Sequence, residues 1–343
     1  MKVKAAVLYK LNKPLVIEEV KISPLGRGQV LVKILYTGIC HTQINEMKGI
    51  KGPDNYLPHT LGHEASGIVK GIGQGVTKVK KGDYVVLHWM KGSGLDAPSA
   101  QYLMGNEKIN SGAITTFNEY SIISENRMTK ITRDVPADVA SIIGCAVLTG
   151  SGIVKNNLKT KPENTLAVFG VGGLGTCAVL LANALGCKKI IAIDIQDKKL
   201  KLAKECGATD IINATRGNPA TKIREITNGQ GVDQAAETSG IKSVVETAFE
   251  SIKFGGTLVF ASNIRKGEKI CLDPWGLING KNIFGTFGGA AKPDEDIPYY
   301  VDLYLKEKLK IKKLLTHQYK LEEINKAFED IEKGKVGRAL IKM

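Results

Sequence analysis

The chain has 343 residues, of which 43% are hydrophobic and 24% are charged, the composition of a globular protein large enough to form two domains. No stretch is apolar and long enough to cross a bilayer, and Lys or Glu interrupts the N-terminal residues, so we expect a cytoplasmic protein without a signal peptide or a membrane partner. The net charge of +14 comes from lysines spread along the chain without a nucleic-acid-binding motif, so we expect no nucleic-acid partner, although this charge favours anionic small molecules.

Residues 1–146 are expected to form a β-rich, barrel-like domain. Segments 30–38, 63–73 and 83–89 carry Val, Ile or aromatic residues between glycine-containing turns, as strands do. The polar stretch 92–113 has weak periodicity and predicts a long surface lobe or loop. The six cysteines include no C-x-x-C pair, so we expect no disulfides.

Residues 147–288 show a different pattern, in which strand-like and helix-like segments alternate. The strand-like segments 165–170 and 188–194 flank a helix-compatible stretch, 174–185. This alternation predicts an α/β domain with a parallel sheet that is covered by helices on both faces. Residues 289–343 contain two further helical stretches and end in a strand-like segment.

The segment GVGGLG fits the G-x-G-x-x-G pattern of a dinucleotide-binding turn, since it follows a strand and opens a helix. One glycine makes the tight turn, one lets the backbone approach a pyrophosphate and one packs the helix against the strand. Asp194 stands nineteen residues beyond Gly175, where a carboxylate bonds the ribose 2′-hydroxyl and repels a 2′-phosphate. NAD is therefore expected rather than NADP. The alternative is a purely structural turn. The expected contacts in this loop are Gly170, Gly172, Gly173, Leu174 and Gly175.

Cys40, in the segment GICHTQINEM, allows three interpretations: a buried apolar residue, a redox thiol or a metal ligand. Taken alone, His63 is most often a core histidine and Glu64 a surface carboxylate. Together with Cys145, however, Cys40 and His63 would supply two thiolates and an imidazole, a three-ligand zinc site with one position left for water or substrate. The spacings of 23 and 82 residues are too long for a local motif, so spacing alone does not reveal the site.

The chain resembles the zinc-dependent medium-chain alcohol dehydrogenases over nearly its whole length. The resemblance implies an α/β fold with a GroES-like β-barrel catalytic domain (1–146), a Rossmann NAD-binding domain (147–288) and a C-terminal return to the catalytic domain (289–343). It also implies one catalytic Zn²⁺ per chain, NAD as the cofactor, and a homodimer or homotetramer. The segments that carry the resemblance are GICHTQ, LGHEASGIV, KGDYVV, GCAVLTG, VFGVGGLG, IAIDIQDKKLKLAKECGATDIIN, GTFGG and LEEINKAFEDIEKGKVGRALI.

The resemblance also implies the roles of individual residues. Cys40, His63 and Cys145 match the catalytic zinc ligands. The Thr42 hydroxyl matches the group that takes the substrate's proton, and Glu64 matches an acid that approaches the metal. The implied cofactor contacts are His41 and Arg338 at the pyrophosphate, Thr149 near the nicotinamide, and Asp194 and Lys199 at the adenosine ribose.

Three departures from the family pattern affect these expectations. Gln43 stands where the family commonly has an aspartate that bonds the zinc histidine, so zinc affinity is expected to differ. Asn45 stands where many members have a proton-relay histidine. The chain has no cysteine between Cys40 and Cys145, so we expect no structural zinc. His88 and Trp89 are expected to line the substrate cleft, although a core role is equally plausible for Trp89.

The sequence therefore predicts a zinc-dependent oxidoreductase that transfers a hydride between an alcohol and NAD. The polar lobe and the altered surroundings of the metal favour a polar or secondary alcohol, such as a polyol or sugar derivative. Two alternatives remain open at this point. One is a zinc-free quinone or enoyl reductase, and the other is a nucleotide-binding protein without catalytic activity.

Overall fold

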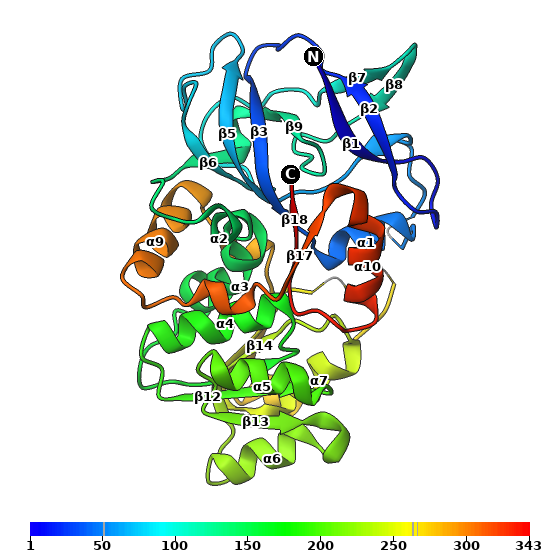
Figure 1. Ribbon diagram of the computed structural model, residues 1–343. Coiled ribbons are helices and arrows are strands. Elements are labelled where there is room, and N and C mark those ends of the chain that lie inside the picture. The colour runs from blue at the N-terminus through cyan, green and yellow to red at the C-terminus, as the bar shows by residue number, and fades with distance from the viewer. Residues whose placement is uncertain (51, 263, 266) are drawn as a thin grey trace. The chain divides into compact units, whose positions relative to one another are not determined.

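The computed structural model describes residues 1–50, 52–262, 264–265 and 267–343, which form two compact units (Figure 1). The first unit comprises Met1–Cys145, Lys292–Leu305 and Leu314–Met343. The second comprises Ala146–Ala291 and Lys306–Lys313.

The first unit is built from a closed barrel and a seven-stranded sheet. The barrel order is β1-β2-β7-β8-β4, and the sheet order is β10-β6-β5-β3-β18-β17 with β9 paired to β3. The bounds of these strands are β1 Lys2–Leu8, β2 Val16–Lys21, β3 Gln29–Gly38, β4 His59–Thr60, β5 Ala65–Ile72, β6 Tyr84–Leu87, β7 Gln101–Met104, β8 Glu107–Asn110, β9 Tyr120–Ser124, β10 Met128–Lys130, β17 His317–Lys320 and β18 Ala339–Lys342. The helices of this unit are α1 His41–Met47, α2 Ala137–Ser141, α9 Pro293–Leu305 and α10 Ile324–Glu332.

The C-terminal residues return to the first unit by strand pairing. Strand β18 pairs antiparallel with β3, so that Leu340 lies opposite Gly38, and the red β18 lies beside the blue β3 in Figure 1. Helix α10 buries Ile324, Ala327 and Phe328 in a core that also contains residues of β1 and α1. This burial explains the i, i+3, i+4 apolar spacing of the helix. The return brings Arg338 next to the segment that carries His63.

The second unit contains a six-stranded parallel sheet in the order β13-β12-β11-β14-β15-β16. In chain order this is the 3-2-1-4-5-6 arrangement of a Rossmann sheet. The central strands β11 and β12 are largely apolar and buried, as expected for a sheet that is covered on both faces. The strand bounds are β11 Thr165–Phe169, β12 Lys189–Asp194, β13 Asp210–Asn213, β14 Val232–Glu237, β15 Ile252–Phe260 and β16 Asn282–Gly285. The helices are α3 Leu148–Gly152, α4 Gly173–Ala184, α5 Asp197–Glu205, α6 Pro219–Ile226, α7 Lys242–Ser251 and α8 Pro274–Ile278.

The polar stretch 92–113 differs from the loop that its composition predicts. It contains the hairpin β7–β8, which closes the barrel, and it buries Tyr102 and Ile109 completely. The two apolar residues lie directly opposite each other across the hairpin. Each strand has only four residues, which is too short for a clear alternating pattern, so the sequence does not reveal the hairpin.

Two carboxylates fasten the segment that precedes this hairpin. Glu125, which is fully buried, accepts hydrogen bonds from the backbone N–H groups of Thr77 (2.6 Å), Lys78 (2.7 Å) and Leu95 (2.7 Å). Asp294 accepts a bond from the Ser93 N–H (2.6 Å) and pairs with the Lys78 ammonium (2.6 Å). Charge-assisted bonds of this kind are stronger than neutral ones. These bonds fix residues 93–95 at the start of the polar stretch 92–113, which contains no cysteines that could bind a structural metal.

Replacing Asp294 by Asn is expected to destabilise the protein in a pH-dependent way. Burial raises the pKa of Asp294, but the bonds from Lys78 and Ser93 outweigh burial and lower this pKa from 3.8 to about 2. A lowered carboxyl pKa contributes stability that is present above the unfolded pKa and is lost as the pH falls towards the folded pKa. Urea midpoints should therefore differ between wild type and Asp294→Asn at pH 6 and converge between about pH 4 and pH 2. If the urea midpoints of the two proteins differ equally at pH 6 and pH 3, the ionised Asp294 carboxylate does not stabilise the fold in this way.

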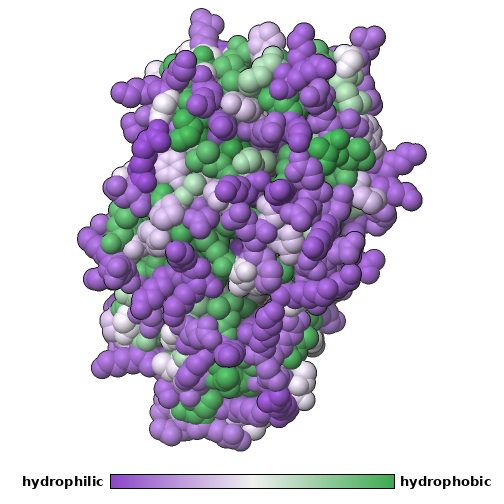
Figure 2. All heavy atoms as spheres, viewed as in Figure 1, coloured by the Kyte–Doolittle hydropathy of each residue, from purple (hydrophilic) through white to green (hydrophobic). Residues whose placement is uncertain are grey.

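Hydrophilic side chains are spread over the face shown in Figure 2 and do not gather into a single patch there. Among the described residues, no helix is both long and apolar enough to span a bilayer.

Candidate functional site

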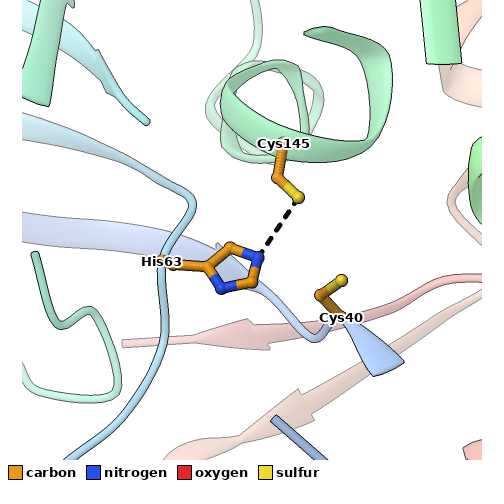
Figure 3. A group of neighbouring side chains, drawn as sticks. All are labelled: Cys40, His63 and Cys145. Carbon is orange, nitrogen blue, oxygen red and sulfur yellow. Dashed lines mark hydrogen bonds between the residues drawn. The ribbon is translucent and has the colours of Figure 1, made fainter. Parts of the chain in front are cut away.

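The structure brings Cys40, His63 and Cys145 together in the first unit. Their ligand atoms all lie within 4.8 Å of one another, and His63 Nε2 is 3.2 Å from Cys145 Sγ. Figure 3 shows the two sulfur atoms and the imidazole pointing into one space, from the start of α1, from a loop and from a helical turn. These residues are separated by 23 and 82 positions in the sequence, so only the fold assembles them.

Two glycines, each directly before a ligand residue, allow the backbone to place His63 and Cys145. Gly62 has a φ of +94° and packs so tightly that a Cβ would lie 2.3 Å from Thr116 Oγ1. Glycine is the residue that adopts this conformation without strain, and it turns the backbone immediately before His63. A Cβ on Gly144 would lie 1.9 Å from the Leu87 carbonyl oxygen, so the π-helical turn that carries Cys145 packs directly on β6.

The position of the Cys40 side chain and the lowered pKa of its thiol both suit a metal ligand. A hydrogen bond from Cys145 lowers the pKa of the Cys40 thiol well below its usual range, and His63 and Arg338 lower it further. The thiolate is the form that binds metals. Cys40 Sγ also lies 3.6 Å from Thr42 Oγ1, so the hydroxyl expected to take the substrate's proton lies beside the metal-ligating group.

Gln43 contacts two of these residues. Its Oε1 accepts a hydrogen bond from the Cys40 backbone N–H (2.8 Å), and its Nε2 lies 2.5 Å from His63 Nδ1. The side chain is buried, with 1% of its surface exposed. The glutamine therefore occupies the position from which the family's aspartate bonds the zinc histidine.

Glu64 and Arg338 form a buried ion pair. Arg338 Nε has no hydrogen-bond partner among the described residues. Burial lowers the pKa of Arg338, while Cys40 raises it. His41, in contrast, is exposed at the first position of α1. The predicted roles of His41 and Arg338 at a pyrophosphate are not tested by these contacts and stay predictions.

The glycine loop of the second unit packs tightly at two of its glycines and is open at a third. Gly170 has a φ of +82°, and a Cβ on Gly175 would lie 2.1 Å from the Gly170 carbonyl oxygen, so α4 packs closely on the loop. A Cβ on Gly172 would meet no described atom within 4 Å, which leaves its backbone open to a ligand. Gly173 and Leu174 begin α4, where unpaired N–H groups favour an anion.

Asp194 ends β12 beside this loop. Its carboxylate accepts hydrogen bonds from the N–H groups of Val171 (3.0 Å), Ile195 (2.8 Å) and Gln196 (3.1 Å). Lys199 lies on α5, just after this turn. Thr149 is buried on α3, next to Gly150, whose Cβ would lie 2.2 Å from the Leu174 carbonyl oxygen. Asp194 thus contacts the glycine loop through Val171, and Gly150, beside Thr149, approaches Leu174.

A cavity of about 540 Å³ in the first unit adjoins Gln43 and His63. Within its wall, His59 Nε2 pairs with Asp54 Oδ2 at 2.7 Å. Sequence reasoning missed these wall residues, although the polar composition of residues 45–59 was a usable indication. The polar side chains of the wall include Glu46, Asp54, His59, Ser99, Ser111 and Thr115.

His88 does not line this cavity, which corrects one sequence expectation. Its side chain is fully buried, with Nδ1 2.7 Å from the Met90 carbonyl oxygen and Nε2 3.0 Å from Thr129 Oγ1. Burial lowers the pKa of His88 to about 4, so the ring is neutral. A histidine at this place in the sequence can be a buried core residue or can line a binding site, and the sequence alone does not distinguish these two roles.

Comparison with known proteins agrees with this arrangement. The family model of the alcohol dehydrogenase GroES-like domain matches residues 26–133, and that of the zinc-binding dehydrogenase matches residues 173–306. Alcohol dehydrogenase 1 of Pisum sativum is 33% identical over 372 residues, covering 100% of this chain and 97% of that protein.

Two solved structures are similar over the whole chain. Benzyl alcohol dehydrogenase from Acinetobacter calcoaceticus superposes with a TM-score of 0.91 at 30% identity, covering 100% of this chain and 99% of that one. For 2R,3R-butanediol dehydrogenase from Bacillus subtilis the TM-score is 0.82 at 25% identity, covering 99% of each chain. With its GroES-like and Rossmann units, the chain belongs to the zinc-dependent medium-chain alcohol dehydrogenase family and is an alcohol oxidoreductase.

Proposed function

We propose that the chain oxidises a polar secondary alcohol with NAD, and reduces the matching carbonyl, at a zinc ion bound by Cys40, His63 and Cys145. The observation that carries this proposal is the convergence of two sulfur atoms and one imidazole nitrogen within 4.8 Å. Zinc favours this donor set, and three protein ligands leave a fourth position for substrate. Zinc bound there would act as a Lewis acid that favours ionisation of an alcohol and polarises a carbonyl.

Thr42 is the residue that moves the proton. Its hydroxyl lies on the first turn of α1, half-buried and 3.6 Å from Cys40 Sγ. A hydroxyl both donates and accepts, so Thr42 would accept the proton of the substrate's hydroxyl group while its own proton passes to solvent water at its half-buried side. Glu64, held by Arg338, would approach the metal when that pair opens.

The second unit would hold NAD, which supplies the hydride chemistry. The open backbone of Gly172 and the start of α4 would take the pyrophosphate. The family resemblance assigns His41 and Arg338 to pyrophosphate contacts as well, and the unpaired Nε of Arg338 suits an anionic ligand. The Asp194 carboxylate would bond the ribose 2′-hydroxyl and reject a 2′-phosphate. Lys199 would contact the same ribose, and Thr149 would pack near the nicotinamide. We thus assign residues 1–146 and 289–343 to metal and substrate, and residues 147–288 to the cofactor.

The cavity beside His63 supports a polar substrate. Its wall carries the hydroxyls of Ser99, Ser111 and Thr115 beside the paired Asp54 and His59, and these groups bond a substrate bearing additional hydroxyl groups better than a purely aromatic or aliphatic one. A site built to hydrogen-bond a hydroxyl rejects an analogue that lacks it, because its own polar groups are left unpaired. A vicinal diol, polyol or sugar alcohol therefore fits this wall best.

NAD reduction over a panel of alcohols tests this function. The expected result is the highest kcat/KM for vicinal diols or sugar-derived secondary alcohols, with NADP used poorly. A preference for short primary alcohols or benzyl alcohol would overturn the substrate class. If no alcohol is oxidised and the protein instead reduces quinones or enoyl compounds without zinc, the proposed zinc-dependent alcohol oxidation would be wrong. Nucleotide binding without turnover of any substrate would support the alternative of a nucleotide-binding protein without catalytic activity.

We also propose that two copies of the chain associate through β16, the edge strand of the Rossmann sheet. Trp275, Ile278, Phe284 and Phe287 are exposed on or beside this strand. The opposite edge strand, β13, exposes Ile211 as its single large apolar side chain. An unpaired, apolar edge readily pairs with another strand. A second copy can offer the same edge about a two-fold axis, which completes the backbone hydrogen bonds of both.

A further inference from the structure

Gln43 has a single amide oxygen but faces two hydrogen-bond donors when the metal site is loaded. One is the Cys40 backbone N–H, which lies 2.8 Å from Gln43 Oε1. This hydrogen bond is part of the cap at the start of α1. The other is His63 Nδ1, 2.5 Å from Gln43 Nε2. A neutral imidazole carries one N–H, and a histidine that ligates a metal through Nε2 must carry this proton on Nδ1.

In the structure, the Gln43 amide nitrogen faces Nδ1. An amide N–H then donates to Nδ1, which requires the imidazole proton to be on Nε2, where it points to Cys145 Sγ at 3.2 Å. Rotating the amide by a half-turn would offer its oxygen to a protonated Nδ1. The same rotation would turn the amide N–H groups towards the Cys40 N–H, so that two donors would face each other. Once Nε2 binds metal, either orientation therefore leaves two buried N–H donors facing each other without an acceptor, which is costly.

We propose that Gln43 is a positioning residue that holds His63 in the Nε2–H tautomer and thereby weakens zinc binding, so that this chain holds its zinc more loosely than a site with a carboxylate at position 43. The inference rests on the proposed function in that zinc is the metal. A glutamate has the same shape as glutamine, and its two oxygens would accept from both the Cys40 N–H and a protonated Nδ1. Only 1% of the Gln43 side chain is exposed, which limits how far water can stand in for the missing acceptor.

Competition for zinc with a chromophoric chelator tests the inference on the full chain. Gln43→Glu is expected to lower the Kd for zinc by about 10- to 100-fold, the usual weight of such a supporting residue. Asn45→Asp, two residues along α1, is the matched control because it adds the same charge without the contact to His63. Equal tightening in both variants would assign the effect to charge and overturn the role of Gln43, as would an unchanged Kd in Gln43→Glu.

The ¹⁵N spectrum of the metal-free imidazoles gives a second readout that charge alone does not move. His63 is expected in the Nε2–H form in the wild type and in the Nδ1–H form in Gln43→Glu. Its signals among the five histidines are identified by their loss in His63→Gln. The same tautomer in both proteins would contradict the inference. If wild type and Gln43→Glu both bind zinc no better than a Cys40→Ser reference, the proposed function fails. The tautomer of His63 in the two proteins still tests the role of Gln43 in that case.

Discussion

Replacing Thr42 by Ala is expected to lower kcat for alcohol oxidation by about 10²- to 10⁴-fold, the usual contribution of a positioned proton-transfer group. The hydroxyl lies 3.6 Å from Cys40 Sγ, whereas Asn45 stands where a relay histidine is common, so the chain depends on Thr42 for the first transfer. Steady-state rates should be compared with zinc content, which should stay unchanged because Thr42 is not a ligand.

The matched control for this variant is Thr42→Ser, which keeps the hydroxyl and removes only a methyl group. It should retain most of the wild-type kcat. If Thr42→Ala is as active as Thr42→Ser, the substrate's proton leaves by another route and the assignment of Thr42 is wrong.

Replacing Phe284 by Asp is expected to convert the protein from a dimer to a monomer at micromolar concentration. The substitution places two carboxylates at the proposed β16–β16 contact, where like charges and buried apolar area both oppose association. Light scattering should give twice the 37.0 kDa chain mass for the wild type and 37.0 kDa for the variant.

Ile211→Asp provides the matched control, because Ile211 is an exposed apolar residue on β13, the opposite edge of the same sheet. This control should remain dimeric. A monomeric wild-type protein, or a Phe284→Asp variant that still forms dimers, would contradict the proposal that β16 forms the interface.

Much of the Rossmann unit follows from the sequence alone. Strands buried on both faces read as continuous apolar runs, and the glycines of GVGGLG mark the turn between β11 and α4, because close packing admits no side chain there. The alternation of strands and helices then predicts a parallel sheet, which the structure has. Local patterns suffice because each βα unit is local in the chain.

The first unit follows far less from local pattern. Its metal site joins Cys40, His63 and Cys145 through long-range strand pairing, so the family resemblance indicated the ligands where spacing could not. The β7–β8 hairpin is too short for a periodic pattern. The Glu64–Arg338 pair joins residues 274 positions apart, and the two contacts of Gln43 depend on where His63 lies.

The most direct test of this account is zinc K-edge X-ray absorption on the purified protein. We expect two sulfur ligands at about 2.3 Å and one imidazole nitrogen at about 2.0–2.1 Å, with a light atom in the fourth position. Cys40→Ser should remove one sulfur from this set, or the metal altogether. A zinc bound only by nitrogen and oxygen, or a wild-type protein that takes up no zinc while it oxidises alcohols, would contradict the proposed metal site and the chemistry built on it.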